Sequence, residues 1–257
     1  MPRLVTFINQ LLSNLGLSLV RNLSRSDLPS LIRRLQNHGI EINVVYDIGA
    51  FKGFWTTALS RQLKSNAKFF MFEPNRTHND YLSRVGHPFF NVLLSDKSEI
   101  KKFFSFEGSG DSYYPELPGD TSQAVVKEIK SVTLDSLVFS SENPIPLPDL
   151  IKIDTQGSEL DILRGAQRVL MSASVIIMEC PIVKYNQGAP DIQDYLDFAL
   201  KNHWIPFSIV EIHILREVFV QIDIAFVSEG IFRERIGDLS DMGFWKSTEN
   251  FYKSGMI

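Results

Sequence analysis

The spacing of apolar residues changes near position 43. Beyond it, short apolar runs alternate with stretches whose apolar residues recur at helical spacing, which is typical of a parallel sheet connected by crossover helices. Strands are predicted over residues 44–48, 68–72, 91–95, 150–153 and 175–179, and helices over 54–63, 77–85 and 160–170. The pattern predicts a doubly wound, mostly parallel α/β fold with right-handed crossovers.

Before position 40 the spacing is helical throughout. Apolar residues from Leu4 to Leu15 form one stripe, and a second helix is predicted over residues 27–37. We expect residues 1–40 to form a helical extension and residues 41–257 to form one α/β domain. The first stripe would pack on that domain or on a second subunit of a homo-oligomer, and the sequence leaves both open. Docking on a membrane surface would need a basic polar face, which this helix lacks.

The rest of the chain adds strands around the predicted sheet. Further strands are predicted over residues 101–106, 131–134, 204–214 and 218–227, the last two as an antiparallel hairpin. The polar segment 108–120 is predicted to be a surface loop over the site, and the proline-rich segment 143–149 a connector. An amphipathic helix begins near Ile192.

Composition narrows the class of protein. The 257 residues carry 26 basic and 30 acidic side chains, intermixed, for a net charge of −4. No basic stripe is present, so we expect no nucleic-acid partner. Cys180 is the only cysteine, which excludes an intrachain disulfide and a thiolate metal cluster. No apolar run reaches the roughly 20 residues of a transmembrane helix, and the first residues lack the order of a signal peptide, so we expect a cytoplasmic protein.

Polar residues lie at the carboxyl end of each predicted strand, either within its last residues or just after it. They are Asp47, Glu73, Ser95 with Asp96, Asp154 with Gln156, and Glu179. Ligands of open α/β sheets bind at this edge. A carboxylate such as Glu73 can accept from two vicinal ribose hydroxyls. The turn after Asp47 lacks the third glycine of a dinucleotide fingerprint and the Gly-Lys-Ser/Thr ending of a phosphate loop. Asp47 favours a ligand with a positive or donor-rich end, such as the amino acid part of S-adenosylmethionine.

Several motifs in a fixed order then resemble one family. They are DIGAFKG at 47–53, FEPN at 72–75, LSDK at 94–97, VTLD at 132–135, LIKIDTQGSEL at 150–160 and IME at 177–179. Over roughly residues 40–230 the chain resembles the FkbM family of S-adenosylmethionine-dependent methyltransferases. The resemblance implies a Rossmann-like class I methyltransferase with a seven-stranded sheet whose last strand is antiparallel. It also implies methyl transfer to an oxygen, here on a sugar or glycan component or a secondary metabolite.

The resemblance also assigns roles to residues. It places Asp47, Gly49, Ala50 and Gly53 along the methionine part of the cofactor. It gives the ribose hydroxyls to Glu73, with Asn75 beside it, and sets Ser95 and Asp96 near the adenine. Asp154 and Gln156 would face the transferred methyl group and the acceptor.

The catalytic base is the least determined part of this picture. Many family members carry Glu where this chain has Gln156, and Ala where it has Ser95. A glutamine cannot take a proton, so the base would be Asp154 or Glu159, with His213 of the predicted hairpin as a third candidate. Asp154 could instead cap a turn, and Glu159 could serve the first turn of a helix. We expect no metal, because no second ligand with recognisable spacing accompanies Asp154.

Two other functions compete with methyl transfer. One is a non-catalytic module that keeps the cofactor fold for partner binding, suggested by Gln156 and the absence of an obvious base. The other is a nicotinamide-dependent oxidoreductase, suggested by an acid after the second strand and opposed by the missing third glycine.

Overall fold

The central strands of this protein are apolar on both faces, so helices must cover both. The computed structural model describes residues 26–64, 66–106, 111–115, 124–140, 144–184 and 186–237. The predicted helix over residues 4–15 and most of the loop 108–120 lie outside these ranges. Within them, no helix is long and apolar enough to cross a membrane.

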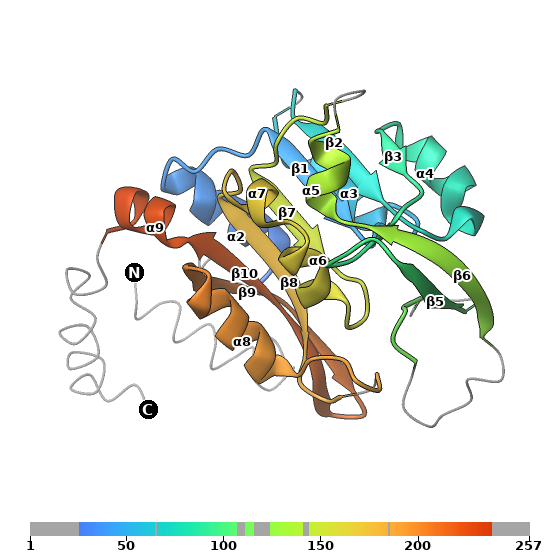
Figure 1. Cartoon of the computed structure of the whole chain (residues 1–257). Helices are drawn as coiled ribbons and strands as arrows, with labels where there is room; N and C mark the ends of the chain where they lie inside the picture. The colour runs from blue at the N-terminus through green and yellow to red at the C-terminus, as the bar shows by residue number, and fades with distance from the viewer. Residues whose placement is uncertain are drawn as a thin grey trace, which may run out of the picture.

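A seven-stranded sheet forms the centre of the fold (Figure 1). Its order is β3 (Phe89–Phe90), β2 (Lys68–Phe72), β1 (Val44–Ile48), β7 (Leu150–Ile153), β8 (Val175–Pro181), β10 (Val218–Ser228) and β9 (Trp204–Leu215). The strands from β3 to β8 are parallel, and β10 is antiparallel to both of its neighbours. This confirms the mostly parallel sheet with an antiparallel last strand. The strand order reverses between β1 and β7, which is where α/β sheets bind ligands.

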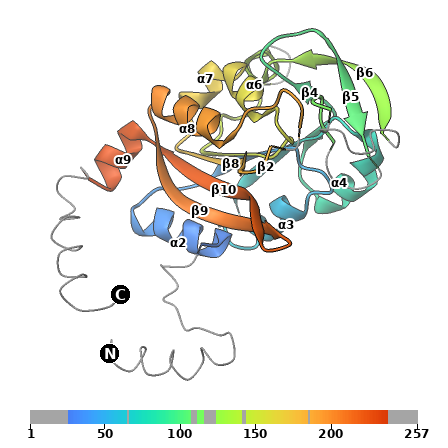
Figure 2. The same cartoon turned by 90° about the horizontal axis from the view of Figure 1, so that it is seen from below.

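Helices pack on both faces of the sheet. One face carries α5 (Leu134–Val138), α6 (Glu159–Arg164), α7 (Gln167–Leu170) and α8 (Ile192–Lys201). The other carries α2 (Leu28–Asn37), α3 (Phe54–Ser60) and α9 (Glu229–Arg235), while α4 (Asn79–Val85) follows the single turn η2 (Arg76–His78). Side chains alternate between the two cores, with Tyr46 in the first and Val45 in the second. In Figure 2, α2 and α8 lie on opposite sides of β9 and β10.

The strand predicted over residues 91–95 is confirmed only at Leu93–Leu94, and it does not belong to the main sheet. The chain pairs with β2 only at Phe89–Phe90, and then β4 (Leu93–Leu94) leaves the main sheet to pair with β6 (Val125–Val132). With β5 (Ile100–Ser105) these form a separate three-stranded sheet. The Asn91 side chain donates to the Glu73 carbonyl at 3.0 Å, so a side chain takes the place of the next ladder bond at the turn.

Several predicted boundaries also shift. The helix predicted over residues 160–170 is two helices, because Asp135 accepts from the N–H groups of Arg168 and Val169 and starts α7 there. The strand predicted over 131–134 is the end of β6, and α5 begins at Leu134 behind a Thr133 cap. The extra strand near 101–106 and the C-terminal hairpin are confirmed as β5 and as β9 with β10.

Candidate functional site

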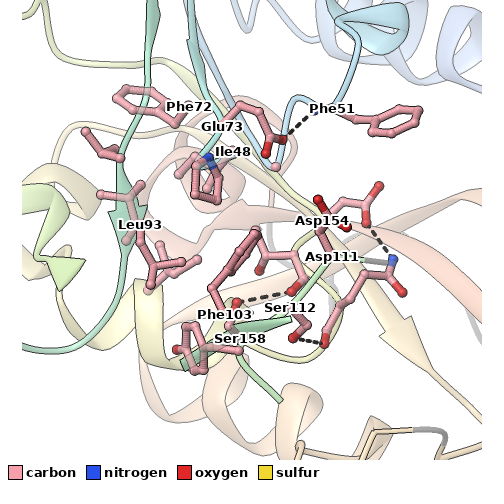
Figure 3. Close-up of a pocket in the computed structure, with 18 residues that line it drawn as sticks. Ile48, Phe51, Phe72, Glu73, Leu93, Phe103, Asp111, Ser112, Asp154 and Ser158 are labelled. Atoms are coloured by element: carbon pink, nitrogen blue, oxygen red, sulfur yellow. Dashed lines mark hydrogen bonds between the residues drawn. The ribbon is translucent and has the colours of Figure 1, made fainter. Parts of the chain in front are cut away.

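A pocket opens at the carboxyl ends of β1, β2 and β7, beside the reversal of strand order (Figure 3). It encloses about 770 Å³, counting the open space at its mouth. One wall is apolar and is formed by Phe72, Val92, Leu93, Leu94, Phe103 and Ile162. The opposite side is polar and includes Glu73, Asp111, Ser112, Asp154, Gln156 and Ser158.

The turn after β1 forms part of the pocket through Gly49. Its φ is +77°, and a Cβ there would lie 1.8 Å from the Asp154 carbonyl oxygen, so the ends of β1 and β7 meet in direct backbone contact. The other two small residues predicted to line a ligand here lie deeper. Ala50 packs with Met71 and Leu82, and Gly53 lies against Val85; neither is among the described residues that line the pocket.

Asp47 is fully buried and acts at a distance from the pocket. Its Oδ2 accepts from Thr56 Oγ1 at 2.6 Å, and its Oδ1 lies 3.6 Å from the Lys152 ammonium. Lys152 in turn donates to Asp154 Oδ2 at 3.1 Å. Burial opposes the charge of Lys152, but the carboxylates of Asp154 and Asp47 outweigh it and raise the pKa of Lys152. Asp47 therefore supports the pocket through Lys152 and does not line it.

Sequence reasoning missed Lys152. The available signal was a lysine in the centre of an otherwise apolar strand, Leu150–Ile153, because a lysine buried there requires an acidic partner.

Glu73 faces the pocket at the end of β2, as predicted (Figure 3). Its Oε2 accepts from the Phe51 N–H and its Oε1 from the Asn75 N–H, both at 2.8 Å. Burial raises the pKa of Glu73 to about 7, against the lowering effect of these two backbone donors. These two hydrogen bonds fix the position of the carboxylate. A ligand hydroxyl that reaches Glu73 would donate a further hydrogen bond to it.

Three other residues predicted to contact the cofactor, Asn75, Ser95 and Asp96, lie outside the described lining of the pocket. Asn75 is buried and donates to Ser105 Oγ at 2.9 Å and Asp111 Oδ2 at 2.6 Å, which fixes the chain between β2 and β5. Ser95 is buried and donates to Asp96, which is exposed. The residues of this part of the chain that do line the pocket are Leu93, Leu94 and Phe103.

Asp154 and Gln156, which the family resemblance assigns to the transferred methyl group and the acceptor, both line the pocket. Gln156 Nε2 donates to Asp154 Oδ1 at 3.0 Å and to Glu179 Oε1 at 2.8 Å, so it joins the ends of β7 and β8. The Gln156 backbone has a φ of +56°. Its carbonyl accepts from Ser112 Oγ at 2.8 Å, which ties the loop to the chain after β5. These bonds hold the polar side of the pocket.

Glu159 holds the loop that carries Gln156. Its carboxylate accepts from the backbone N–H groups of Thr155 at 2.7 Å and Gly157 at 2.9 Å, and from the Tyr195 hydroxyl. Burial raises the pKa of Glu159. The residue is outside the described pocket lining, and its contacts are those of a positioning residue.

His213 lies on β9 beside Asp223 of β10, with Nε2 and Oδ1 3.4 Å apart. It too is outside the described lining of the pocket. Of the three predicted base candidates, all of them in described parts of the chain, Asp154 is the one whose side chain borders the pocket.

The described part of the predicted loop 108–120 does border the pocket. Asp111, Ser112 and Tyr113 are lining residues. The hydroxyls of Tyr113 and Tyr114 both donate to Asp161 Oδ2 at 2.9 Å, which anchors this segment on α6. A two-tyrosine pair in a polar loop was the signal that could have indicated an anchored segment.

The strand order, the antiparallel β10 and a pocket at the reversal of strand order define a Rossmann-like class I methyltransferase fold. The model of the methyltransferase FkbM domain matches residues 47–203, more than half of the chain. The chain therefore belongs to the FkbM methyltransferase family.

Two curated relatives are similar over part of their length. The hexuronic acid methyltransferase AglP of Haloferax volcanii is 31% identical over 156 residues, which is 58% of this chain and 60% of AglP. The 2-O-methyltransferase NoeI of Sinorhizobium fredii is 27% identical over 172 residues, 60% of this chain and 70% of NoeI. Among solved structures, an O-methyltransferase from Bacillus cereus is similar with a TM-score of 0.43 and 16% identity, over 89% of this chain and 100% of that one. That similarity is too slight to bear on function.

Proposed function

We propose that this protein is an S-adenosylmethionine-dependent methyltransferase that methylates a hydroxyl group of a sugar or glycan component. The observation that carries the proposal is Glu73, a buried carboxylate that faces the pocket beside an apolar wall at the carboxyl end of β2. Membership of the FkbM family supports the reaction, and the names of AglP and NoeI support a sugar hydroxyl as the acceptor.

The pocket fits an adenosine-containing cofactor. Glu73 would hold the ribose hydroxyls, and the apolar lining at Leu93 and Phe103 suits an adenine ring. Gly49 lines the pocket at the end of β1 and would border the methionine part, while Asp47 and Lys152 keep that end of the sheet in place. When bound, S-adenosylmethionine supplies a methyl group on a sulfonium, and its transfer to an oxygen depends mainly on alignment of the two reactants.

Asp154 would take the proton of the acceptor hydroxyl. It borders the pocket, and its two oxygens are oriented by Lys152 and Gln156. The same two contacts prevent the carboxylate from turning away, so the acceptor would meet it in a fixed orientation.

The cofactor half of the proposal is tested by isothermal titration with S-adenosylmethionine and S-adenosylhomocysteine. Glu73→Gln should weaken binding of both by roughly 10- to 100-fold, the value of a lost charged hydrogen-bond acceptor. Glu128→Gln, which removes an exposed acid on β6, is the matched control and should leave the affinity unchanged. If the wild type binds neither compound, the cofactor assignment is wrong.

The acceptor half is tested by methyl transfer to glycosides of hexuronic acids and of neutral hexoses. Asp154→Asn should lower kcat by roughly 10²- to 10⁴-fold, as expected for loss of a general base, while the affinity for S-adenosylhomocysteine changes little. Transfer to proteins or to small phenols, with none to any sugar, would overturn the acceptor class and leave the cofactor assignment standing.

A further inference from the structure

Three potential metal ligands from three strands converge beside the pocket. Glu179 of β8, His213 of β9 and Asp223 of β10 each place a ligand atom within 4.8 Å of the others. Neither His213 Nε2 nor Asp223 Oδ1 has a hydrogen-bond partner among the described residues, although both atoms are buried. Asp223 is only 9% exposed. The two atoms lie 3.4 Å apart, and a buried carboxylate oxygen and imidazole nitrogen without a hydrogen bond are costly unless an ion or a water molecule binds to both.

The strand register explains why acids gather here. Ile153 pairs with Met178, so Asp154 and Glu179 follow at the same level, and Glu179 pairs with Asp223. The Lys152 ammonium lies at one end of this row, against Asp154. The register therefore places the carboxyl groups of Asp154, Glu179 and Asp223 in one row across β7, β8 and β10.

We propose that Glu179, His213 and Asp223 bind a divalent first-row transition-metal ion of the Mn²⁺ or Zn²⁺ kind. One imidazole nitrogen and two carboxylate oxygens suit these ions, whereas Mg²⁺ prefers oxygen ligands alone. The His213 side chain is 34% exposed, so the cluster lies just beneath the surface and an ion can enter. Three protein ligands leave coordination positions open for water or substrate oxygens.

The site adjoins the polar side of the pocket. Gln156 Nε2 donates both to Glu179 Oε1 and to Asp154 Oδ1, so one side chain separates the cluster from the proposed base. Resting on the proposed function, the open positions of the ion would take hydroxyl oxygens of the sugar acceptor and orient it toward Asp154. The presence of Gln156 in place of an acid fits this arrangement, because an amide links the two carboxylates without adding a further negative charge.

A second cluster, formed by Glu73, His78 and Asp111, is less suited to a cation. Both oxygens of Glu73 already accept from backbone N–H groups, and Asp111 Oδ2 accepts from Asn75. An ion there would have to displace donors from both carboxylates, whereas in the first cluster Gln156 and Gln221 donate to Glu179 but no described residue donates to Asp223 Oδ1. The cluster serves as a comparison in the test.

The test is metal binding by the full chain after chelator treatment, without cofactor or acceptor. Mn²⁺ is titrated by electron paramagnetic resonance and Zn²⁺ by calorimetry, with Mg²⁺ for comparison. The wild type should bind one Mn²⁺ or Zn²⁺ more tightly than Mg²⁺. His213→Gln and Asp223→Asn should each weaken binding by roughly 10- to 100-fold or more. His203→Gln removes another histidine that pairs with an acid, Glu229, and is the matched control.

Circular dichroism melting of each variant shows whether it is folded, and Asp223→Asn keeps the shape of the buried side chain. The proposal is overturned if the wild type binds neither ion, if binding survives both His213→Gln and Asp223→Asn, or if it is lost in His78→Gln instead. Because no cofactor is present, these results are independent of methyl transfer. A wild type that binds S-adenosylhomocysteine but no metal would overturn the metal site alone.

Discussion

Replacing Lys152 with methionine tests how strongly the fold depends on one buried ion pair. The Lys152 side chain is 6% exposed and lies between Asp47 at 3.6 Å and Asp154 at 3.1 Å. Methionine has a similar length and no charge. In the variant, Asp47 keeps Thr56 as a hydrogen-bond donor but loses its counter-charge in a site without solvent.

The size of the effect follows from these distances. At an effective dielectric constant of about 20, charges this far apart attract by roughly 5 kcal/mol per pair. Much of that is offset because the variant no longer buries an ammonium. Breaking a buried pair by removing one partner costs about 3–5 kcal/mol overall. For a chain of this size, that corresponds to a Tm lower by roughly 6–20 °C.

Urea unfolding followed by circular dichroism measures the loss directly. Lys102→Met, on an exposed part of β5, is the matched control and should change the free energy of unfolding by less than about 0.5 kcal/mol. Adding Asp47→Asn to Lys152→Met should recover part of the loss, because the uncompensated charge is gone. A loss below about 1 kcal/mol for Lys152→Met, with no recovery in the double variant, would refute the reasoning.

Three further variants test other parts of the site. Gly49→Ala should cost about 2–4 kcal/mol in urea unfolding through its clash with the Asp154 carbonyl, whereas Gly86→Ala, with a similar φ of +81° but open space, should cost only about 1 kcal/mol. Glu159→Gln should lower the unfolding free energy by about 1–3 kcal/mol and weaken S-adenosylhomocysteine binding in calorimetry, because an amide group replaces one of the two carboxylate oxygens that accept from Thr155, Gly157 and Tyr195. Burial holds the pKa of Glu73 near 7 against an ordinary 4.5, so the folded state binds the extra proton and stability falls as pH rises through this window. The unfolding free energy of the wild type should therefore fall between about pH 5 and about pH 8, and in Glu73→Gln this fall should be smaller by up to about 3 kcal/mol.

The sheet was predictable because its strands have strong local patterns. β1, β7 and β8 are short apolar runs bounded by polar turns, and a run buried on both faces occurs mainly in a parallel sheet. The strand at 91–95 failed for a tertiary reason. Leu93 and Leu94 are apolar enough for a strand of the main sheet, but they pair instead with β6, a partner more than 30 residues later in the chain.

The candidate site was predictable where the carboxyl ends of strands meet. Glu73 and Asp154 both follow the last residue of a parallel strand, and both line the pocket. The split helix near Gly165 was not predictable, because it depends on a long-range contact. A Cβ at Gly165 would lie 2.2 Å from the Ser95 carbonyl oxygen, and only the folded chain brings these segments together.

Strand parity explains the different position of Asp47. Within β1, Tyr46 and Ile48 face the core beneath the pocket, whereas Val45 faces the core beneath α2. Asp47 shares the parity of Val45 and so points away from the pocket. Its register partner on β7 is Lys152, which explains why the two charges meet on that face. An acid inside a strand follows the parity of the strand, while an acid just after the strand is free to turn toward a ligand.

Strand parity also distinguishes the acids that lie within strands at this edge of the sheet from those that follow a strand. Glu179 and Asp223 lie within β8 and β10 and are register partners, so their side chains share a face whatever the ligand does. The cluster with His213 cannot be inferred from local sequence, because it requires β10 to lie between β8 and β9. The acids that lie within strands, and whose direction the strand parity sets, are those with a counter-ion. Lys152 is the counter-ion of Asp47, and the proposed metal ion would be that of Glu179 and Asp223. Asp154 follows β7 and borders the pocket. It contacts Lys152 directly and Glu179 through Gln156, so a change in either counter-ion should alter the position or the charge of this proposed base.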